Sequence, residues 1–209
     1  MIGCEPFSIE QEKQLLDFFK AHRHATRNVA LLTFGIQTGF RISEILSLTI
    51  GDLYKGGRMV DRVYMRKWNM KGGKSGKATG RSMILAKNTK NAIQAQVDYL
   101  AGRDRTGPEQ PIFQTQNFEI REAMKYTSAW RILNYAAKEL GMTIKVGTHS
   151  MRKTFAARIY SNLVDTKKNA DALRILQAGL GHENINNTIR YLSFREDDLN
   201  EAISDVFGR

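Results

Sequence analysis

The sequence predicts a mainly α-helical chain with a small antiparallel β-sheet, which is an α+β fold. Apolar residues recur at helical spacing in several segments that end near glycines. Only residues 58–85 change to short strand-like runs around a glycine-rich piece. The 209 residues, of which 42% are hydrophobic, are enough for one well-packed core. We therefore expect one domain over residues 1–209, with a core at about 7–195 and an acidic helical tail at about 196–207.

The first part of the chain predicts three helices, over residues 8–21, 28–37 and 42–48. Ser8, followed three residues later by Gln11, is a capping-box pattern that begins the first of them. The second, NVALLTFGIQ, should end near Gly39. Arg41 then stands at the junction of two helices, which would fix its backbone while its side chain faces a groove.

The middle of the chain predicts a hairpin, and the remainder predicts further helices. Strand-like runs at 59–60, 63–65 and 83–85 lie on either side of KGGKSGKATG, a typical turn composition. Helices are then expected at 88–101, 122–140, 150–162 and 170–178, followed by a short one carrying Tyr191 and a last one at about 197–206.

The charge distribution favours a polyanionic partner such as nucleic acid. The formal net charge is +11, and residues 55–90 hold eleven basic side chains but a single acid, Asp61. After Tyr191 the balance becomes acidic, which suggests a tail that faces protein rather than DNA.

The composition disfavours membrane-spanning, secreted, disulfide-bonded and zinc-binding proteins. The longest apolar runs are too short to span a bilayer, and the first residues do not resemble a signal peptide. Cys4 is the single cysteine, so no intrachain disulfide can form and a reducing cytoplasm is expected. One cysteine and four scattered histidines give no structural zinc pattern.

Five residues in four short segments have the chemistry of metal-independent phosphodiester cleavage: Arg41, His149, Arg152, His182 and Tyr191. Arginine can neutralise charge on the non-bridging oxygens with its planar fork. Histidine can donate a hydrogen bond or exchange a proton, and tyrosine can form a phosphodiester that allows the strand to be resealed. His149 and Arg152 share one face at a helix start, where the free N–H groups favour an anion.

The segments TGFRISEILSL, THSMRKTFAARIY and LQAGLGHENINNTIRYL, with the hairpin before ILA, resemble the catalytic domain of the tyrosine recombinase (phage integrase) family. They follow the family's order over nearly the whole chain. The resemblance implies that Arg41 and Arg152 grip the scissile phosphate, His149 is a base or hydrogen-bond donor, His182 stabilises the transition state, and Tyr191 is the nucleophile. It implies a 3′-phosphotyrosine intermediate and a free 5′ hydroxyl, formed without a metal ion or a nucleotide cofactor.

The same resemblance places a catalytic lysine in the hairpin turn, shortly before the basic residue that opens the next strand. Arg81 opens that strand, which favours Lys77, with Lys74 and Lys71 as alternatives. Because this segment has almost no acids, we also predict contacts with DNA phosphates, from Arg66, Lys67, Lys71, Lys74 and Arg81. Glu44 and Thr188 are interpreted as supporting residues, Glu44 by orienting a buried neighbour and Thr188 by supporting the tyrosine helix.

The predicted activity is site-specific recombination or integration of double-stranded DNA in the cytoplasm, at the nucleoid. The resemblance implies self-association on DNA, from dimer to tetramer, and accessory DNA-bending proteins as further partners. The usual N-terminal core-binding domain is expected to be absent from this sequence, because the catalytic motifs begin almost at once; an excised fragment and a naturally minimal protein both fit this expectation. Two alternatives stay open, a type IB topoisomerase-like relaxing enzyme and a DNA-binding regulator that has lost catalysis.

Overall fold

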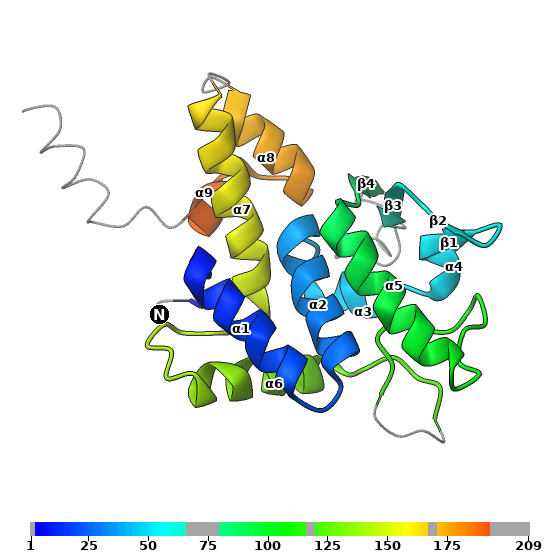
Figure 1. Ribbon diagram of the computed structural model, residues 1–209. Helices are drawn as coiled ribbons and strands as arrows, with labels where there is room; N and C mark the ends of the chain where they lie inside the picture. Colours follow the sequence, from blue (N-terminus) through cyan, green and yellow to red (C-terminus); the bar gives the residue numbers. More distant parts are fainter. Residues whose placement is uncertain (1–2, 66–79, 116–119, 167–170, 193–209) are drawn as a thin grey trace, which may run out of the picture. The chain divides into compact units, whose positions relative to one another are not determined.

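The computed structural model describes residues 3–65, 80–115, 120–166 and 171–192, which are mostly helical (Figure 1). The elements in chain order are α1 (Ile9–Ala21), α2 (Ala25–Thr38), α3 (Ile42–Leu46), α4 (Ile50–Leu53), β1 (Tyr54–Lys55), β2 (Arg58–Met59), β3 (Arg62–Met65), β4 (Arg81–Ile84), α5 (Lys87–Ala101), α6 (Tyr126–Glu139), α7 (Thr148–Asp165), α8 (Ala172–Leu180) and α9 (Ile185–Leu192). The predicted fold class, mainly α with a small antiparallel β component, is confirmed.

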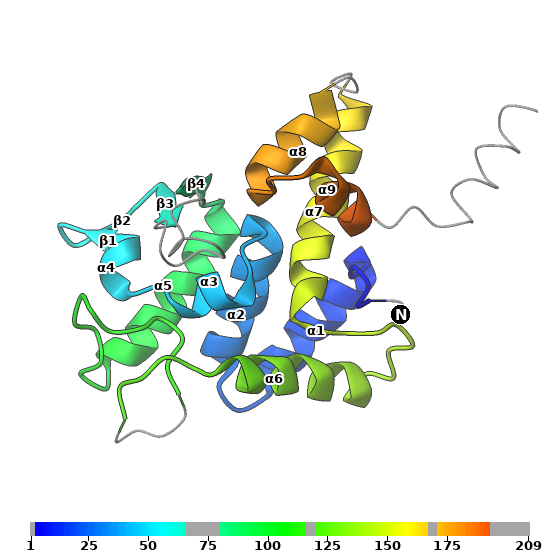
Figure 2. The ribbon, with the colours of Figure 1, turned by 180° about the vertical axis from the view of Figure 1, so that it is seen from behind.

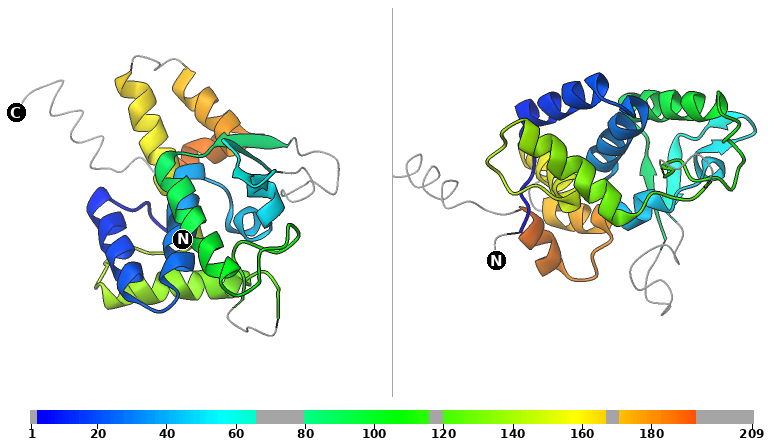
Figure 3. Two further views of the ribbon diagram at one scale, coloured as in Figure 1. Left: turned by 45° about the vertical axis from the view of Figure 1, so that its right-hand side comes forward. Right: turned by 90° about the horizontal axis from the view of Figure 1, so that it is seen from below.

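Contacts divide the chain into two compact units, residues 1–155 and 156–209, and helix α7 continues through the division. In the first unit, α2 is buried on nearly every side, and the middle of the helix is mostly apolar. It packs against α1 and α5, and α1 also contacts α6 (Figures 2 and 3). The core of this unit includes Leu15, Phe34, Ile45 and Ile93, all without exposed surface. In the second unit α8 packs against α9.

The predicted beginning of the first helix and the predicted end of the second are both found in the structure. Ser8 accepts a hydrogen bond from the Gln11 backbone at 3.1 Å, and the Gln11 side chain accepts one from the Ser8 backbone, so the capping box is confirmed. Helix α2 ends at Gly39, as expected, although it begins at Ala25, before the apolar run. Helix α7 is longer than predicted and starts at Thr148.

Where the sequence predicted one small antiparallel sheet, the described residues form two separate two-stranded ones. Strand β1 pairs with β2 and β3 pairs with β4, with Val63 opposite Met83. The sequence did not predict β1, because Tyr54 and Lys55 form too short a run to show alternation.

Three helix boundaries also differ from the prediction. The third helix ends at Leu46 rather than 48, and α4, which Thr49 and Asp52 cap, follows it without having been predicted. Helix α6 begins at Tyr126 rather than 122, because Ala123 forms a β-bridge with Gln114. Helix α8 covers 172–180 rather than 170–178, since the left-handed residue that ends it is Gly181. The predicted helix at 197–206 lies outside the described residues.

None of the described helices combines the length and apolar character needed to cross a membrane.

Candidate active site

Gly39 ends α2 and organises the residues around Arg41. Its φ of 63° is left-handed, and a Cβ at this position would lie 2.4 Å from the ring of Phe155, so only glycine fits without strain. The Gly39 carbonyl accepts a hydrogen bond of 2.5 Å from Nη1 of Arg152, which comes from α7. Arg41, two residues later, is the N-cap of α3. One tight turn therefore brings the two predicted phosphate-binding arginines to the same place.

Glu44 holds Arg41 from inside the protein. Its carboxylate has no exposed surface, and Oε1 accepts a hydrogen bond of 2.9 Å from Nη1 of Arg41. Its Oε2 accepts one of 2.7 Å from the Arg41 backbone N–H, so the same residue caps α3. The Arg41 side chain keeps 20% of its surface exposed. Glu44 orients its neighbour as predicted, although this neighbour, Arg41, is partly exposed rather than buried.

Arg81 is the second partner of Glu44, which corrects the prediction that placed it on a DNA-facing surface. Nη2 of Arg81 donates to Oε2 of Glu44 at 2.5 Å, and the guanidinium lies 4.5 Å above the ring of Phe40. Burial lowers the pKa of Arg81, and the charge of Glu44 counteracts part of this effect. With its side chain only 8% exposed, Arg81 anchors the first residue of β4 to the turn that carries Arg41.

Arg152 and His149 lie in the first turns of α7, as predicted. Arg152 is fully buried, so little water screens its charge. His149 is exposed at the helix start, yet neighbouring protein atoms still remove part of its hydration. That desolvation, followed by repulsion from Arg152, Arg41 and Lys153, lowers the pKa of His149 below its ordinary 6.5. The imidazole is therefore neutral at pH 7 and can accept a proton.

We expect NMR titration of His149 to give a pKa below 6.5 in the free protein and a higher one with a DNA duplex bound, because a phosphate offsets the three cations. Lys153→Gln should raise the pKa in the free protein, since it removes one of those charges. Between 6.5 and the lowered pKa the unfolded chain binds more protons, so this residue makes stability fall as the pH drops through that window. A pKa of 6.5 or above in the free protein would contradict the electrostatic description.

His182 and Tyr191 come together in the second unit. Gly181 ends α8 in a left-handed conformation, and His182 follows it with 9% of its surface exposed. Nδ1 of His182 is 3.0 Å from the hydroxyl of Thr188, and the ring centroids of His182 and Tyr191 are 5.1 Å apart. Thr188 is completely buried in α9, in agreement with its predicted supporting role.

Sequence reasoning missed one contributor to this cluster. Gln177 accepts the backbone N–H of His182 at its carbonyl, and its Nε2 donates to the His182 carbonyl at 3.0 Å, so it fixes the histidine on both sides. A glutamine on a helix gives no distinctive sequence signal.

The structure thus places the predicted site residues in two groups, each described within its own unit. Arg41, His149 and Arg152 belong to the first unit, and His182 and Tyr191 to the second. The predicted catalytic Lys77 and the DNA contacts Arg66, Lys67, Lys71 and Lys74 lie outside the described residues. Within the described ranges, no cluster of three or more His, Cys, Asp or Glu side chains could hold a metal ion.

The known proteins described next, to which this chain is similar, are recombinases. The chain is 28% identical over 195 residues to the tyrosine recombinase XerA of Pyrococcus furiosus, and the match covers 93% of this chain and 59% of the relative. Its fold is similar to that of a XerA recombinase crystal structure, with a TM-score of 0.72 and 21% identity, covering the whole chain and 67% of XerA. It is also similar to XerH bound to a palindromic difH substrate after cleavage, with a TM-score of 0.68, 20% identity and coverage of 98% of this chain and 53% of XerH.

The chain therefore spans between about half and two thirds of the length of these relatives. The model of the phage integrase family matches residues 7–197, which include both groups of site residues. This chain belongs to the phage integrase family.

Proposed function

We propose that this chain is the single catalytic domain of a site-specific DNA recombinase or integrase. The observation that carries the proposal is the joint placement of Arg41 and Arg152 around the Gly39 turn, with a neutral His149 beside them. Two guanidinium groups can neutralise the two negative oxygens of a phosphodiester transition state, and an unprotonated imidazole can take the proton of an attacking hydroxyl. Family membership and the DNA-bound XerH relative agree with a DNA substrate.

In the proposed reaction, the phenolic oxygen of Tyr191 attacks the phosphorus while Arg41 and Arg152 bind the non-bridging oxygens. The P–O5′ bond breaks, and a 3′-phosphotyrosine and a free 5′ hydroxyl result. His149 accepts the phenolic proton, and His182, held by Thr188, donates a hydrogen bond to the phosphate. Attack by another strand's 5′ hydroxyl reverses these steps and joins new partners, so no external energy source is required.

The partners follow from this chemistry. Double-stranded DNA is the substrate, bound in part by Arg66, Lys67, Lys71 and Lys74. Exchange between two duplexes requires more than one copy of the enzyme, so we propose self-association on DNA, from dimer to tetramer, with accessory DNA-bending proteins. Such a protein acts on the nucleoid in the cytoplasm.

The test is covalent trapping on a library of nicked duplexes, in which the short released strand diffuses away and prevents resealing. We expect a protein–DNA adduct at the 3′ phosphate, and sequencing of the trapped duplexes should give a defined target. Relaxation of supercoiled plasmid without a preferred sequence or strand exchange would instead indicate a type IB topoisomerase-like enzyme. Absence of adduct on every duplex, with DNA binding retained, would indicate a regulator.

We further propose Lys77 as the general acid that protonates the leaving 5′ oxygen. Lys77→Ala should cleave an ordinary duplex slowly and regain most of the wild-type rate when sulfur replaces the bridging 5′ oxygen. A thiolate leaves without a proton, because the pKa of a thiol is only about 8.5. Lys71→Ala and Lys74→Ala are the matched controls. If the sulfur substrate rescues one of these variants and not Lys77→Ala, that lysine is the general acid instead.

A further inference from the structure

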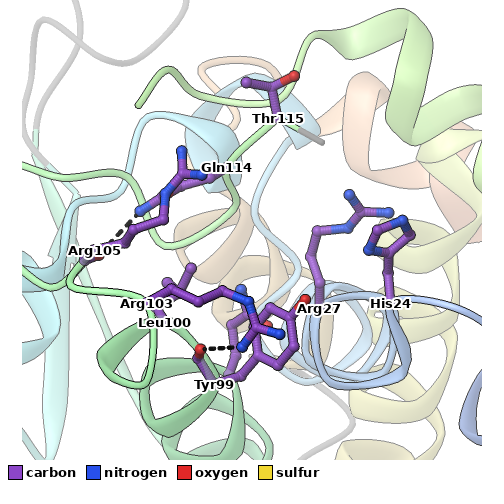
Figure 4. Close-up of a pocket in the computed structure, with 9 residues that line it drawn as sticks. His24, Arg27, Tyr99, Leu100, Arg103, Arg105, Gln114 and Thr115 are labelled. Carbon is purple, nitrogen blue, oxygen red and sulfur yellow. Dashed lines mark hydrogen bonds between the residues drawn. The ribbon is translucent and has the colours of Figure 1, made fainter. Parts of the chain in front are cut away.

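A second basic cavity lies in the first unit, at the opposite end of α2 from Arg41 (Figure 4). His24 and Arg27 at the start of α2 line it, together with Tyr99, Arg103, Arg105 and Gln114. An adjoining cavity of about 350 Å³ shares Arg27 and adds Arg131. Within α2 (Ala25–Thr38), the helix axis from Arg27 to Thr38 is about 17 Å long at 1.5 Å per residue, and Arg41 lies beyond that end. This cavity is therefore distinct from the candidate active site.

Arg27 is a buried cation whose charge no carboxylate balances in the described part of the chain. It is 5% exposed, and its hydrogen bonds, from Nε at 3.1 Å and Nη2 at 2.9 Å, both go to the amide oxygen of Asn28. Burial lowers the pKa of Arg27 to about 10. Enclosing a guanidinium without an anionic partner costs stability, so this position needs an explanation other than packing.

Two neighbouring groups add to that cost. Gln114 is 3% exposed, and its Nε2 donates to the carbonyls of Arg105 and Pro111, which leaves its buried Oε1 without a hydrogen-bond partner among the described atoms. Nε2 of His24 is likewise buried without a partner there. His24 also has a left-handed backbone with φ of 65°, which is strained for a residue with a side chain. Strained backbone and buried polar atoms without partners are typical of ligand-binding sites.

We propose that this cavity binds a phosphate group, either that of a free phosphate compound or one in a DNA backbone. The residues that line the two cavities include Arg27, Arg103, Arg105 and Arg131 but no carboxylate. Planar guanidinium groups bind phosphate oxygens in pairs. A phosphate beside Arg27 would balance its charge, and Nε2–H of His24, whose side chain lies beside Arg27 in Figure 4, can donate to a phosphate oxygen.

The first experiment measures thermal unfolding of the full chain with inorganic phosphate and pyrophosphate, against sodium chloride at equal ionic strength. A ligand that binds only the folded state raises its Tm. We expect pyrophosphate to raise the Tm well beyond the salt control. Arg27→Gln should be at least as stable as wild type without phosphate, because it removes the unbalanced charge, and should bind pyrophosphate about tenfold more weakly. Arg58→Gln, an exposed arginine outside the cavity, is the matched control.

Arg103→Gln is a second variant that keeps the test decisive if Arg27→Gln fails to fold, because Arg103 is exposed and stacks on Tyr99 at 3.8 Å. It should also weaken pyrophosphate binding. The proposal is overturned if wild type gains no more stability than in sodium chloride, or if the foldable cavity variants keep the full gain. Destabilisation of Arg27→Gln in every buffer, with pyrophosphate binding unchanged, would also overturn it, since Arg27 would then be structural.

A second arm identifies the source of the phosphate. If the cavity holds a DNA backbone phosphate, Arg27→Gln should reduce the slope of log affinity for a duplex against log salt by about one. If it holds a free phosphate compound, that slope should stay at the wild-type value while pyrophosphate binding weakens. These outcomes are independent of covalent trapping, so the phosphate site can fail while the proposed recombinase activity stands, and the reverse.

Discussion

Replacing Tyr191 with phenylalanine is expected to abolish the covalent adduct on nicked DNA while leaving DNA binding unchanged. The change removes only the phenolic oxygen, which is the proposed nucleophile. The phenylalanine ring keeps the contact with His182, whose centroid lies 5.1 Å away, so the second unit should fold normally. The measurement is denaturing electrophoresis of the adduct beside a binding titration with an intact duplex.

Tyr135→Phe is the matched control for this experiment, because Tyr135 is 55% exposed on α6 and belongs to neither group of site residues. It should form adduct at the wild-type level. An undiminished adduct from Tyr191→Phe would remove Tyr191 from the mechanism and require peptide mapping of the residue attached to DNA.

Glu44→Ala is expected to give the largest loss of stability of any single change at the site, about 3–5 kcal/mol. It leaves the buried guanidinium of Arg81 without its carboxylate and removes the acceptor for the Arg41 backbone N–H at the start of α3. Urea unfolding gives the free energy directly, and Glu109→Ala, an exposed loop carboxylate, should change it little. A loss below about 1 kcal/mol would show that Glu44 does not hold the two arginines as described.

A double variant separates the structural effect of Glu44 from its effect on Arg41. Glu44→Met with Arg81→Met replaces the buried ion pair with apolar side chains, which often restores most of the stability. Arg41 would still lack the carboxylate that fixes its guanidinium at 2.9 Å. We therefore expect near-normal stability but slow adduct formation at saturating DNA. Recovery of both properties would show that Arg41 needs no positioning by Glu44.

The sequence predicted those parts of the fold that local chemistry determines. Ser8 and Gln11 cap α1, Gly39 ends α2, and Tyr191 lies on a short helix, because each depends on residues close in the chain. Boundaries set by distant partners were missed. Helix α6 starts late because Ala123 pairs with Gln114, which periodicity within the helix cannot reveal.

The candidate site shows the same distinction between what local sequence determines and what distant partners determine. The identities of Arg41, His149 and Arg152 follow from their motifs, but the role of Arg81 does not. Its position in a highly basic segment favours a solvent-facing charge, and its burial depends on Glu44, 37 residues earlier. The unbalanced charge of Arg27 was equally hidden, because an arginine near a helix start ordinarily reaches water.

The hydrogen bond from Arg152 to the Gly39 carbonyl joins residues 113 positions apart in the chain. The spacing between the two predicted phosphate-binding arginines is therefore set by one backbone oxygen and not by the length of the chain between them. Insertions in an intervening loop such as residues 103–110 should leave this spacing unchanged, since lengthening a loop alters closure entropy only slowly. The length of that connection can thus change while the turn that joins Arg152 to the residues beside Arg41 stays constant.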